Sequence, residues 1–208
     1  MLANFLVDKK IVIQDIATQI TATIDCDKYL CNDTLNIIFA LDNDYAFEYI
    51  LCILNSKLVN VWFKKIFPAG LHIKTNQLEQ IPIPAIPVDT QQPFVALADT
   101  MFTLNQQLQE KRSRFHRRLT ENMEGVKITT ALQTFDKLTF AEFVAELKKQ
   151  KIKLTLAQQD EWEDYFNQYA DACRQITAQI TATDHEIDLR VYQLYGLTDE
   201  EIKTIEES

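Results

Sequence analysis

The chain has 208 residues, of which 47% are hydrophobic and 25% are charged, and its formal net charge is -9. Such a composition is that of an ordinary soluble protein with one or two domains. Only three glycines occur, which excludes a glycine-rich phosphate loop and a dinucleotide-binding fingerprint. The sequence carries no secretory signal and no apolar run of about eighteen residues, so a cytoplasmic protein without membrane contact is expected.

The first part of the chain predicts a small sheet. Residues 11–13 are β-branched, which is typical of a buried strand, and the polar Gln14 follows them at the end of that strand. Residues 19–24 alternate apolar and polar side chains, and residues 35–41 predict a third strand. Tyr29, in the turn before the third strand, can stack on a base or pack in the core, and we expect the core.

A helix of roughly twenty residues is predicted next, because apolar residues recur at intervals of three and four from Phe47 to Trp62. Lys64 and Lys65 end it. Their charge suits a helix C-terminus, or they flank a binding loop. We read the helix as unbroken.

A proline-rich stretch separates two structural regimes. Pro82, Pro84 and Pro87 remove backbone donors and favour extended geometry in the residues before them. The polar segment 72–77 leads into this strap, and Asn76 with Glu79 can cap a single helical turn there. We therefore predict an α+β protein, with a small mixed α/β domain at residues 1–90 and a long antiparallel, coiled-coil-like helical region at residues 91–208.

The helical region is predicted from its apolar spacing. One long helix begins with Pro93 in its first turn and continues to Gly125, and a second covers residues 156–194. Thr139 and Thr198, each followed three residues later by Glu, predict capping boxes for two short helices. The two long stripes should pair antiparallel.

The sequence shows no recognisable catalytic constellation. Asp136 with Glu146 and Lys148 superficially resembles the spacing of a metal-dependent nuclease, but these residues fall on a predicted amphipathic helix rather than on strands. Residues 184–188 are rich in acids and histidine, yet neighbours in a helix point in different directions. The four cysteines, Cys26, Cys31, Cys52 and Cys173, are interpreted as reduced core residues. No catalytic centre and no metal site is expected in this chain.

Charge is unevenly distributed along the sequence. Residues 1–90 hold seven lysines and no arginine against ten acids, whereas residues 111–118 carry five positive charges and no acid. Because phosphate binding depends on Lys and Arg, non-specific affinity for DNA should be poor outside that basic cluster. The cluster can contact phosphates, an acidic partner surface or only solvent.

Four phrases together resemble a known family. They are Lys10-Ile-Val-Ile-Gln14, Ile53-Leu-Asn-Ser-Lys-Leu58, Leu78-Glu-Gln-Ile-Pro-Ile-Pro84 and the tail at residues 186–202. In this order they resemble the C-terminal target recognition domain, or TaqI-like specificity domain, of type IIG restriction-modification enzymes, which is similar to half of a type I specificity subunit. The resemblance implies sequence-specific recognition of double-stranded DNA for adenine methylation. It also implies methyltransferase and nuclease domains upstream as partners, which would hold S-adenosylmethionine and Mg²⁺, so the chain is expected to be a C-terminal fragment.

The resemblance does not identify the residues that contact DNA, so side-chain chemistry indicates the candidates. Asn and Gln can pair with adenine, and Lys or Arg with guanine, in the major groove. Other cations can position the phosphate backbone. The candidates are Gln14, Lys64, Lys65, His72, Lys74, Thr75, Asn76, Gln77, Arg114, Arg117 and Arg118.

Two other classes of function compete with DNA recognition. The helices can form a protein-interaction or assembly module in which DNA has no part, which an uncovered apolar stripe would favour. A self-contained enzyme is disfavoured by the missing motifs. Clustering of the basic residues on one concave face would favour DNA recognition.

Overall fold

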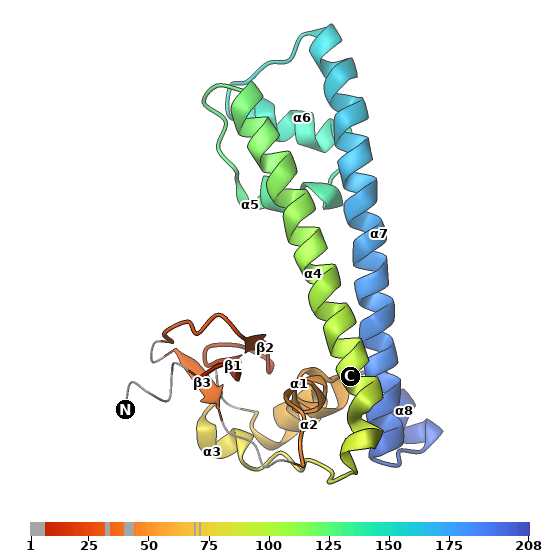
Figure 1. Ribbon diagram of the computed structural model, residues 1–208. Coiled ribbons are helices and arrows are strands. Elements are labelled where there is room, and N and C mark those ends of the chain that lie inside the picture. The colour runs from red at the N-terminus through yellow and green to blue at the C-terminus, as the bar shows by residue number, and fades with distance from the viewer. Residues whose placement is uncertain (1–6, 32–33, 40–43, 69, 71) are drawn as a thin grey trace. The chain divides into compact units, whose positions relative to one another are not determined.

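The computed structural model describes residues 7–31, 34–39, 44–68, 70 and 72–208 (Figure 1). By its contacts the chain divides into two compact units, one of residues 1–100 with 183–208, here called the mixed unit, and one of residues 101–182, called the helical unit. The elements in order are β1 (Lys10–Gln14), β2 (Ala22–Asp25), β3 (Leu35–Ile38), α1 (Phe47–Asn55), α2 (Lys57–Ile66), α3 (Thr75–Leu78), α4 (Val88–Asn122), α5 (Thr130–Gln133), the 3₁₀ helix η2 (Phe135–Lys137), α6 (Phe140–Lys149), α7 (Leu156–Leu194) and α8 (Asp199–Glu206). The predicted α+β class is confirmed.

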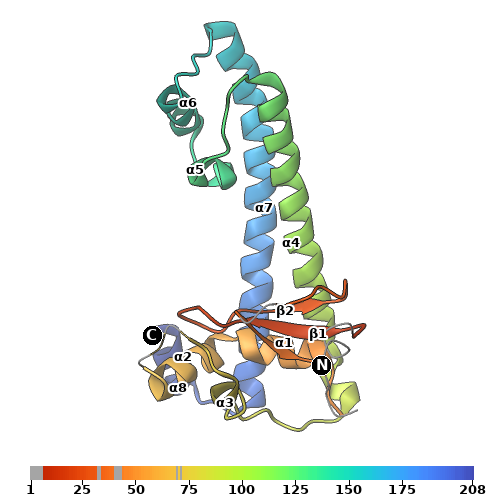
Figure 2. The same ribbon diagram turned by 90° about the vertical axis from the view of Figure 1, so that its left-hand side faces the viewer.

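The three strands form an antiparallel sheet in the order β2-β1-β3. Val12 lies opposite Thr23 on one side and Ile37 on the other, so these residues share one face of the sheet. Ile11 and Ile13 point to the opposite face and are fully buried. Helix α1 packs on this inner face against β1 and β2 (Figure 2). The outer face is therefore the one that α1 leaves open.

The helix predicted as one unit from residue 47 is broken at Ser56, so that prediction was wrong. Ser56 has extended backbone angles, and its hydroxyl donates to Ile53 O and accepts from Val59 N. It therefore ends α1 and caps α2. Asn60, in α2, explains why the break is kept, since its side chain accepts from Ile20 N at 2.7 Å and donates to Asn55 O at 3.3 Å.

Residues 82–87 of the strap form neither helix nor strand, as predicted, but α4 begins at Val88 rather than at Pro93. Pro93 lies inside the helix, where it removes one backbone donor. The fully buried side chain of Gln91 accounts for the early start. It accepts from Ala46 N at 2.8 Å and donates to Asp44 O at 2.6 Å and Ile86 O at 3.0 Å.

The helical unit has its own core. In both views the parts of α4 and α7 in this unit lie side by side and run antiparallel, as predicted (Figures 1 and 2). Phe115 of α4 is fully buried and stacks on Phe135 of η2, with ring centroids 3.7 Å apart. Phe143 of α6 and Phe166 of α7 complete this aromatic centre. The intervening short helices thus close the core between the two long ones.

The last residues of the chain pack in the mixed unit. Asp188 of α7 accepts from the backbone N–H of Lys57 at 2.8 Å, and the Tyr195 hydroxyl donates to Pro82 O. Gly196, with φ +67, ends α7 in the left-handed region. By contacts residues 183–208 thus group with residues 1–100. The division at residue 90 into two domains stays a prediction.

Two further expectations about buried residues were only partly correct. Cys52 and Cys173 are buried, but Cys26 is exposed and Cys31 is half-buried. Tyr29 is 67% exposed and does not pack in the core. The reason is that the turn after β2 is held by its backbone, with Asp27 N and Tyr29 N donating to the Asp25 carboxylate. In the described part of the chain, no helix is both long and apolar enough to cross a membrane.

Candidate nucleic-acid interface

The polar segment 72–77 is fixed to one end of the sheet. Ile73 N donates to Asp15 O at 2.7 Å, and Ile16 forms an antiparallel bridge with His72. From β3, the Asn36 amide donates to Ile73 O at 2.6 Å. Ile73 itself is buried. Contacts from β3 and from the residues just after β1 therefore set the position of this segment.

Inside the segment, the side chains divide into two groups. The Thr75 hydroxyl donates to Asn36 Oδ1 at 2.9 Å, and the Gln77 side chain accepts from Lys74 N at 2.9 Å. Gln77 thus accepts the hydrogen bond from the backbone N–H that precedes the single turn α3, a capping role that was expected of Asn76 and Glu79. The side chains of Lys74 and Asn76 are exposed.

His72 lies beside the same end of the sheet. Its Nδ1 is 3.0 Å from Asp15 Oδ2, and the two side chains are 57% and 22% exposed. The contact is a hydrogen bond in either state and an ion pair when the imidazole is protonated. His72 is thereby oriented by a carboxylate, which lowers its value as a freely moving phosphate contact.

The outer face of the sheet forms a shallow concavity of about 500 Å³ beside this segment. The side chains of Val12, Gln14 and Leu35 share that face by strand register, together with Thr21 and Thr23. None of the described residues that line it carries a charge. Gln14 is exposed there, directly before Asp15. Ile16, which also lines the concavity, forms the bridge with His72, so Gln14 and the segment 72–77 lie at the same end of the sheet. The Asn36 side chain, which bonds to Ile73 and Thr75, shares the opposite face with Ile13.

Lys64 and Lys65 occupy the last turn of α2 and are exposed. In the same part of the chain, Phe63 and Phe67 pack with ring centroids 5.0 Å apart. The positive charges of Lys64 and Lys65 lie at the C-terminal end of α2, where the helix dipole stabilises them. No described hydrogen bond joins these lysines to the segment 72–77, so they form a separate pair of cations in the same unit.

The three arginine candidates belong to the helical unit. Arg114 and Arg117 are exposed, and Arg118 pairs with Glu121 at 3.2 Å one turn further along α4. Arg112, from the same basic cluster, is different. Its guanidinium donates two hydrogen bonds of 2.7 Å to the buried carboxylate of Asp136, and this contact raises the pKa of Arg112. Sequence reasoning missed this pair, because no local pattern links residues 24 positions apart.

Asp136 is therefore a structural carboxylate and not part of a nuclease-like site. Glu146, which the superficial motif requires, lies on α6 and pairs with Lys149. Arg174 adds hydrogen bonds of 2.8 Å to the carbonyl oxygens of Asp136 and Leu138. Within the described ranges, no group of three or more His, Cys, Asp or Glu side chains is placed to hold a metal ion.

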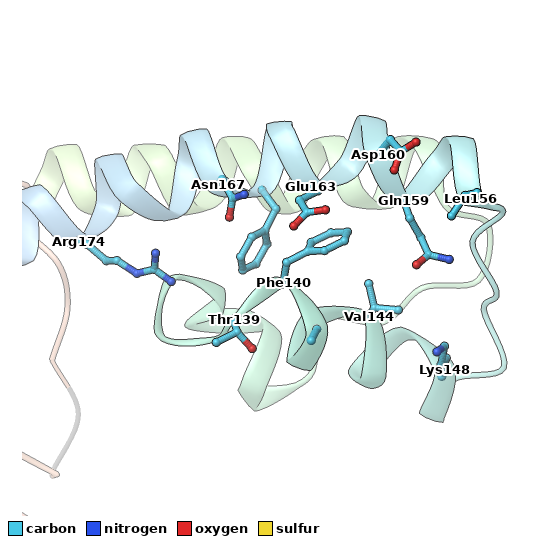
Figure 3. Close-up of a pocket in the computed structure, with 12 residues that line it drawn as sticks. Thr139, Phe140, Val144, Lys148, Leu156, Gln159, Asp160, Glu163, Asn167 and Arg174 are labelled. Atoms are coloured by element: carbon cyan, nitrogen blue, oxygen red, sulfur yellow. The ribbon is translucent and has the colours of Figure 1, made fainter.

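The helical unit also contains a groove of about 710 Å³ between α6 and α7 (Figure 3). Phe140, Val144 and Phe166 supply apolar surface, while Asp160 and Glu163 project from α7. Leu156, at one end, is 77% exposed. The described lining has neither a histidine nor a cysteine. The groove thus combines apolar surface with the carboxylates of Asp160 and Glu163.

The sequence phrases that carry the family resemblance meet within the mixed unit. Asn55 donates to Ala22 O at 3.0 Å and accepts from Ala22 N at 2.8 Å, so it pairs with the edge strand β2 as a neighbouring strand would. Lys57 N contacts Asp188, and Tyr195 contacts Pro82. These residues support the sheet and the strap rather than an active site. The sequence indicated these residues only through the Asn-Ser-Lys phrase at residues 55–57. It gave no sign that Asn55 bonds to Ala22 or that Lys57 bonds to Asp188.

Two family models match successive parts of the chain. Residues 2–83 match the model of the TaqI-like C-terminal specificity domain, and residues 87–191 match that of a domain of unknown function, DUF8810. No curated protein and no solved structure matches the chain. The first match covers the sheet, α1, α2 and α3 and supports DNA recognition in restriction-modification, whereas the second spans just over half of the chain. The chain therefore belongs to the DUF8810 family and carries a TaqI-like C-terminal specificity domain at residues 2–83.

Proposed function

We propose that this chain recognises a short DNA sequence as the specificity module of a restriction-modification enzyme, with the segment 72–77 in direct contact with the duplex. The observation that carries the proposal is the way Asp15 and Asn36 hold this segment while Lys74 and Asn76 expose their side chains. Base readout requires exposed polar side chains on a backbone that is held in place, because each hydrogen bond that discriminates between bases must be positioned accurately.

The roles of the candidate residues follow from their contacts. Asn76 is suited to pair with an adenine edge, and Lys74 to a guanine edge or a phosphate. Thr75, Gln77 and His72 already make hydrogen bonds inside the unit, which favours a positioning role for them. Lys64 and Lys65 are free to neutralise phosphates, which position the duplex without reading its sequence.

The helical unit contributes to the proposal through Arg114, Arg117 and Arg118. These exposed arginines are suited to phosphates or to an acidic surface of the same enzyme. We place the chain at the C-terminal end of a type IIG enzyme. The methyltransferase and nuclease domains, with S-adenosylmethionine and Mg²⁺, would then belong to other parts of that enzyme, and α4 and α7 would support their docking.

The competing function, assembly through uncovered helices, has less support. The apolar stripe of α4 is buried in the helical unit at Leu104, Leu108, Leu119 and Met123. Phe102 is 63% exposed, but single exposed apolar residues are common on protein surfaces. An assembly module that uses this stripe would need it to be open.

The direct test is selection of duplexes from a randomised pool by the purified chain at low and moderate salt. We expect enrichment of one short asymmetric motif. Asn76→Ala should then relax the preference at one adenine by about 1–3 kcal/mol. Lys74→Ala should reduce the slope of log affinity against log salt by about one if it contacts a phosphate. The absence of any enriched motif at low salt would contradict the proposal.

Matched controls separate these effects from general changes in the protein. Asn105→Ala removes an exposed asparagine from α4, and Lys153→Ala removes an exposed lysine from the loop before α7. Neither belongs to the proposed interface, and both should leave the selected motif and the salt slope unchanged. Loss of selection in these two variants as well would show that the effect of Asn76→Ala is not local.

A further inference from the structure

The outer face of the sheet has an unusual composition for the surface of so acidic a protein. The chain has 30 acidic against 21 basic residues. Yet the described lining of the concavity consists of hydroxyl, amide and aliphatic side chains, among them Gln14, Thr21, Thr23, Val12 and Leu35. A polyanion can approach this face without meeting a carboxylate in its lining. An uncharged face of this kind is unsuited to phosphates but suited to base edges.

Hydrogen bonds and an ion pair fix the backbone at both ends of the concavity. At one end, the fully buried Lys10 pairs with Asp25 at 3.0 Å and donates to Tyr29 O at 2.5 Å, which fixes the turn after β2 above that end of the outer face. At the other end, Gln14 is followed by Asp15, which holds His72 and Ile73. The open part of the face therefore lies between an exposed Tyr29 and the segment 72–77.

The backbone of this face is narrow enough to approach a groove of B-form DNA. Neighbouring strands lie about 4.8 Å apart, so three strands span roughly 10 Å. The major groove is about 12 Å wide and the minor groove about 6 Å. Sheets and β-ribbons are known to enter DNA grooves in this way. Sheets can use either groove, but only the major groove displays the thymine methyl group, to which aliphatic side chains are complementary.

We propose that the outer face of the β2-β1-β3 sheet is a second base-reading surface, on which Val12 and Leu35 contact a thymine methyl group in the major groove while Thr23 and Gln14 bond to neighbouring base edges. This inference rests on the proposed function and extends it from the segment 72–77 to the sheet. The major groove displays the thymine methyl beside hydrogen-bonding groups, so a face that mixes aliphatic and polar side chains is complementary to it. Ile16, which is 51% exposed at the rim, adds to the apolar part.

The chemical test replaces each thymine of the selected duplex, one at a time, by deoxyuridine, which lacks only the methyl group. Burying one methyl-sized group changes affinity by about fourfold. We expect a loss of that size at one or more thymines with the unmodified chain. With Val12→Ala, a mild change on the half-buried centre of the face, the same replacement should have no further effect. Equal binding of every deoxyuridine duplex would overturn the methyl contact.

A matched pair of charge insertions tests the surface itself. Thr23→Glu places a carboxylate on the exposed face of β2, whereas Thr100→Glu adds the same charge at an exposed position of α4 in the same unit. We expect Thr23→Glu to weaken binding by at least about tenfold and Thr100→Glu to leave it within about twofold. Circular dichroism and thermal unfolding of both variants verify folding.

The outcomes distinguish this inference from the proposed function. If Thr23→Glu binds as Thr100→Glu does while Asn76→Ala still loses the motif, the outer face does not read bases and recognition by the segment 72–77 stands. If the unmodified chain selects no motif, both proposals fail. If Thr23→Glu loses binding and deoxyuridine sensitivity disappears with Val12→Ala, the sheet is the second reading surface.

Discussion

Replacing Arg112 by alanine tests whether the basic cluster on α4 is one uniform charged surface. Both hydrogen bonds from Arg112 to Asp136 are 2.7 Å long, and the Asp136 side chain is only 3% exposed. Removing the guanidinium would leave that carboxylate buried without its charged partner. Breaking a buried pair costs about 3–5 kcal/mol. Because the Arg112 side chain is 23% exposed, we expect the lower end, about 3 kcal/mol.

The neighbouring arginine provides a matched control. Arg114 carries the same charge two residues away but is exposed, so Arg114→Ala should change the free energy of unfolding by no more than about 0.5 kcal/mol. Arg112→Lys keeps the charge and loses the planar fork that reaches both carboxylate oxygens, so an intermediate loss is expected.

The assay is urea unfolding followed by the fluorescence of Trp162, in a Trp62→Phe background so that one tryptophan reports. Trp162 packs against Phe115, with ring centroids 6.2 Å apart, and therefore follows the core of the helical unit. For an m value of about 1–3 kcal/mol/M, a loss of 3 kcal/mol lowers the midpoint by about 1–3 M. Equal midpoints for Arg112→Ala and Arg114→Ala would refute the reasoning.

Three further predictions address stability and the support of the interface. Burial raises the pKa of Asp188 to about 6, so the folded chain binds this proton more tightly than the unfolded chain; the resulting stabilisation is complete below about pH 4 and is lost as the pH rises through about 6. Asp188→Asn should abolish this slope, worth roughly 3 kcal/mol, in unfolding free energies measured from pH 4 to 8, and a slope identical to that of the unmodified chain would contradict it. Phe115→Ala should lower the unfolding free energy of the helical unit by about 3–5 kcal/mol, measured by urea unfolding; a loss below 1 kcal/mol would mean that the aromatic centre is not tightly packed. Asn36→Ala removes two hydrogen bonds to the segment 72–77 and should speed amide hydrogen exchange at residues 73–75 without unfolding the sheet, whereas unchanged exchange would show that Asn36 does not hold the segment.

Local features of the sequence were enough to predict several elements. The capping boxes at Thr139 and Thr198 are present, because each depends on a glutamate only three residues away. The absence of helix and strand at residues 82–87 follows from the restrictions that the prolines impose on themselves and on the residues before them. Helix α7 covers the range indicated by its apolar spacing, residues 156–194. In each case the deciding interactions are local.

Other elements could not be predicted, because their partners are distant in the chain. The break at Ser56 is kept by Asn60, which bonds to Ile20, and the early start of α4 by Gln91, which bonds to Ala46 and Asp44. The apolar spacing continues across Ser56, so it predicts an unbroken helix there. At the start of α4, it predicts a helix that begins near Pro93 rather than at Val88. Propensity is a weak preference that such contacts override.

The candidate site shows the same distinction. Polar composition and the chemistry of base recognition select residues 72–77 and Gln14 as candidates, and their contact with DNA stays a prediction. Which of their side chains are engaged by the protein itself was decided by Asn36 and Asp15, whose hydrogen bonds hold Thr75 and His72. The concave face appeared only once the strand register placed Gln14 beside Leu35 and Val12 opposite Thr23. Sequence by itself determined the residue types available for recognition, whereas the tertiary structure decided their arrangement, because a hydrogen bond between distant residues exists only after the chain has folded.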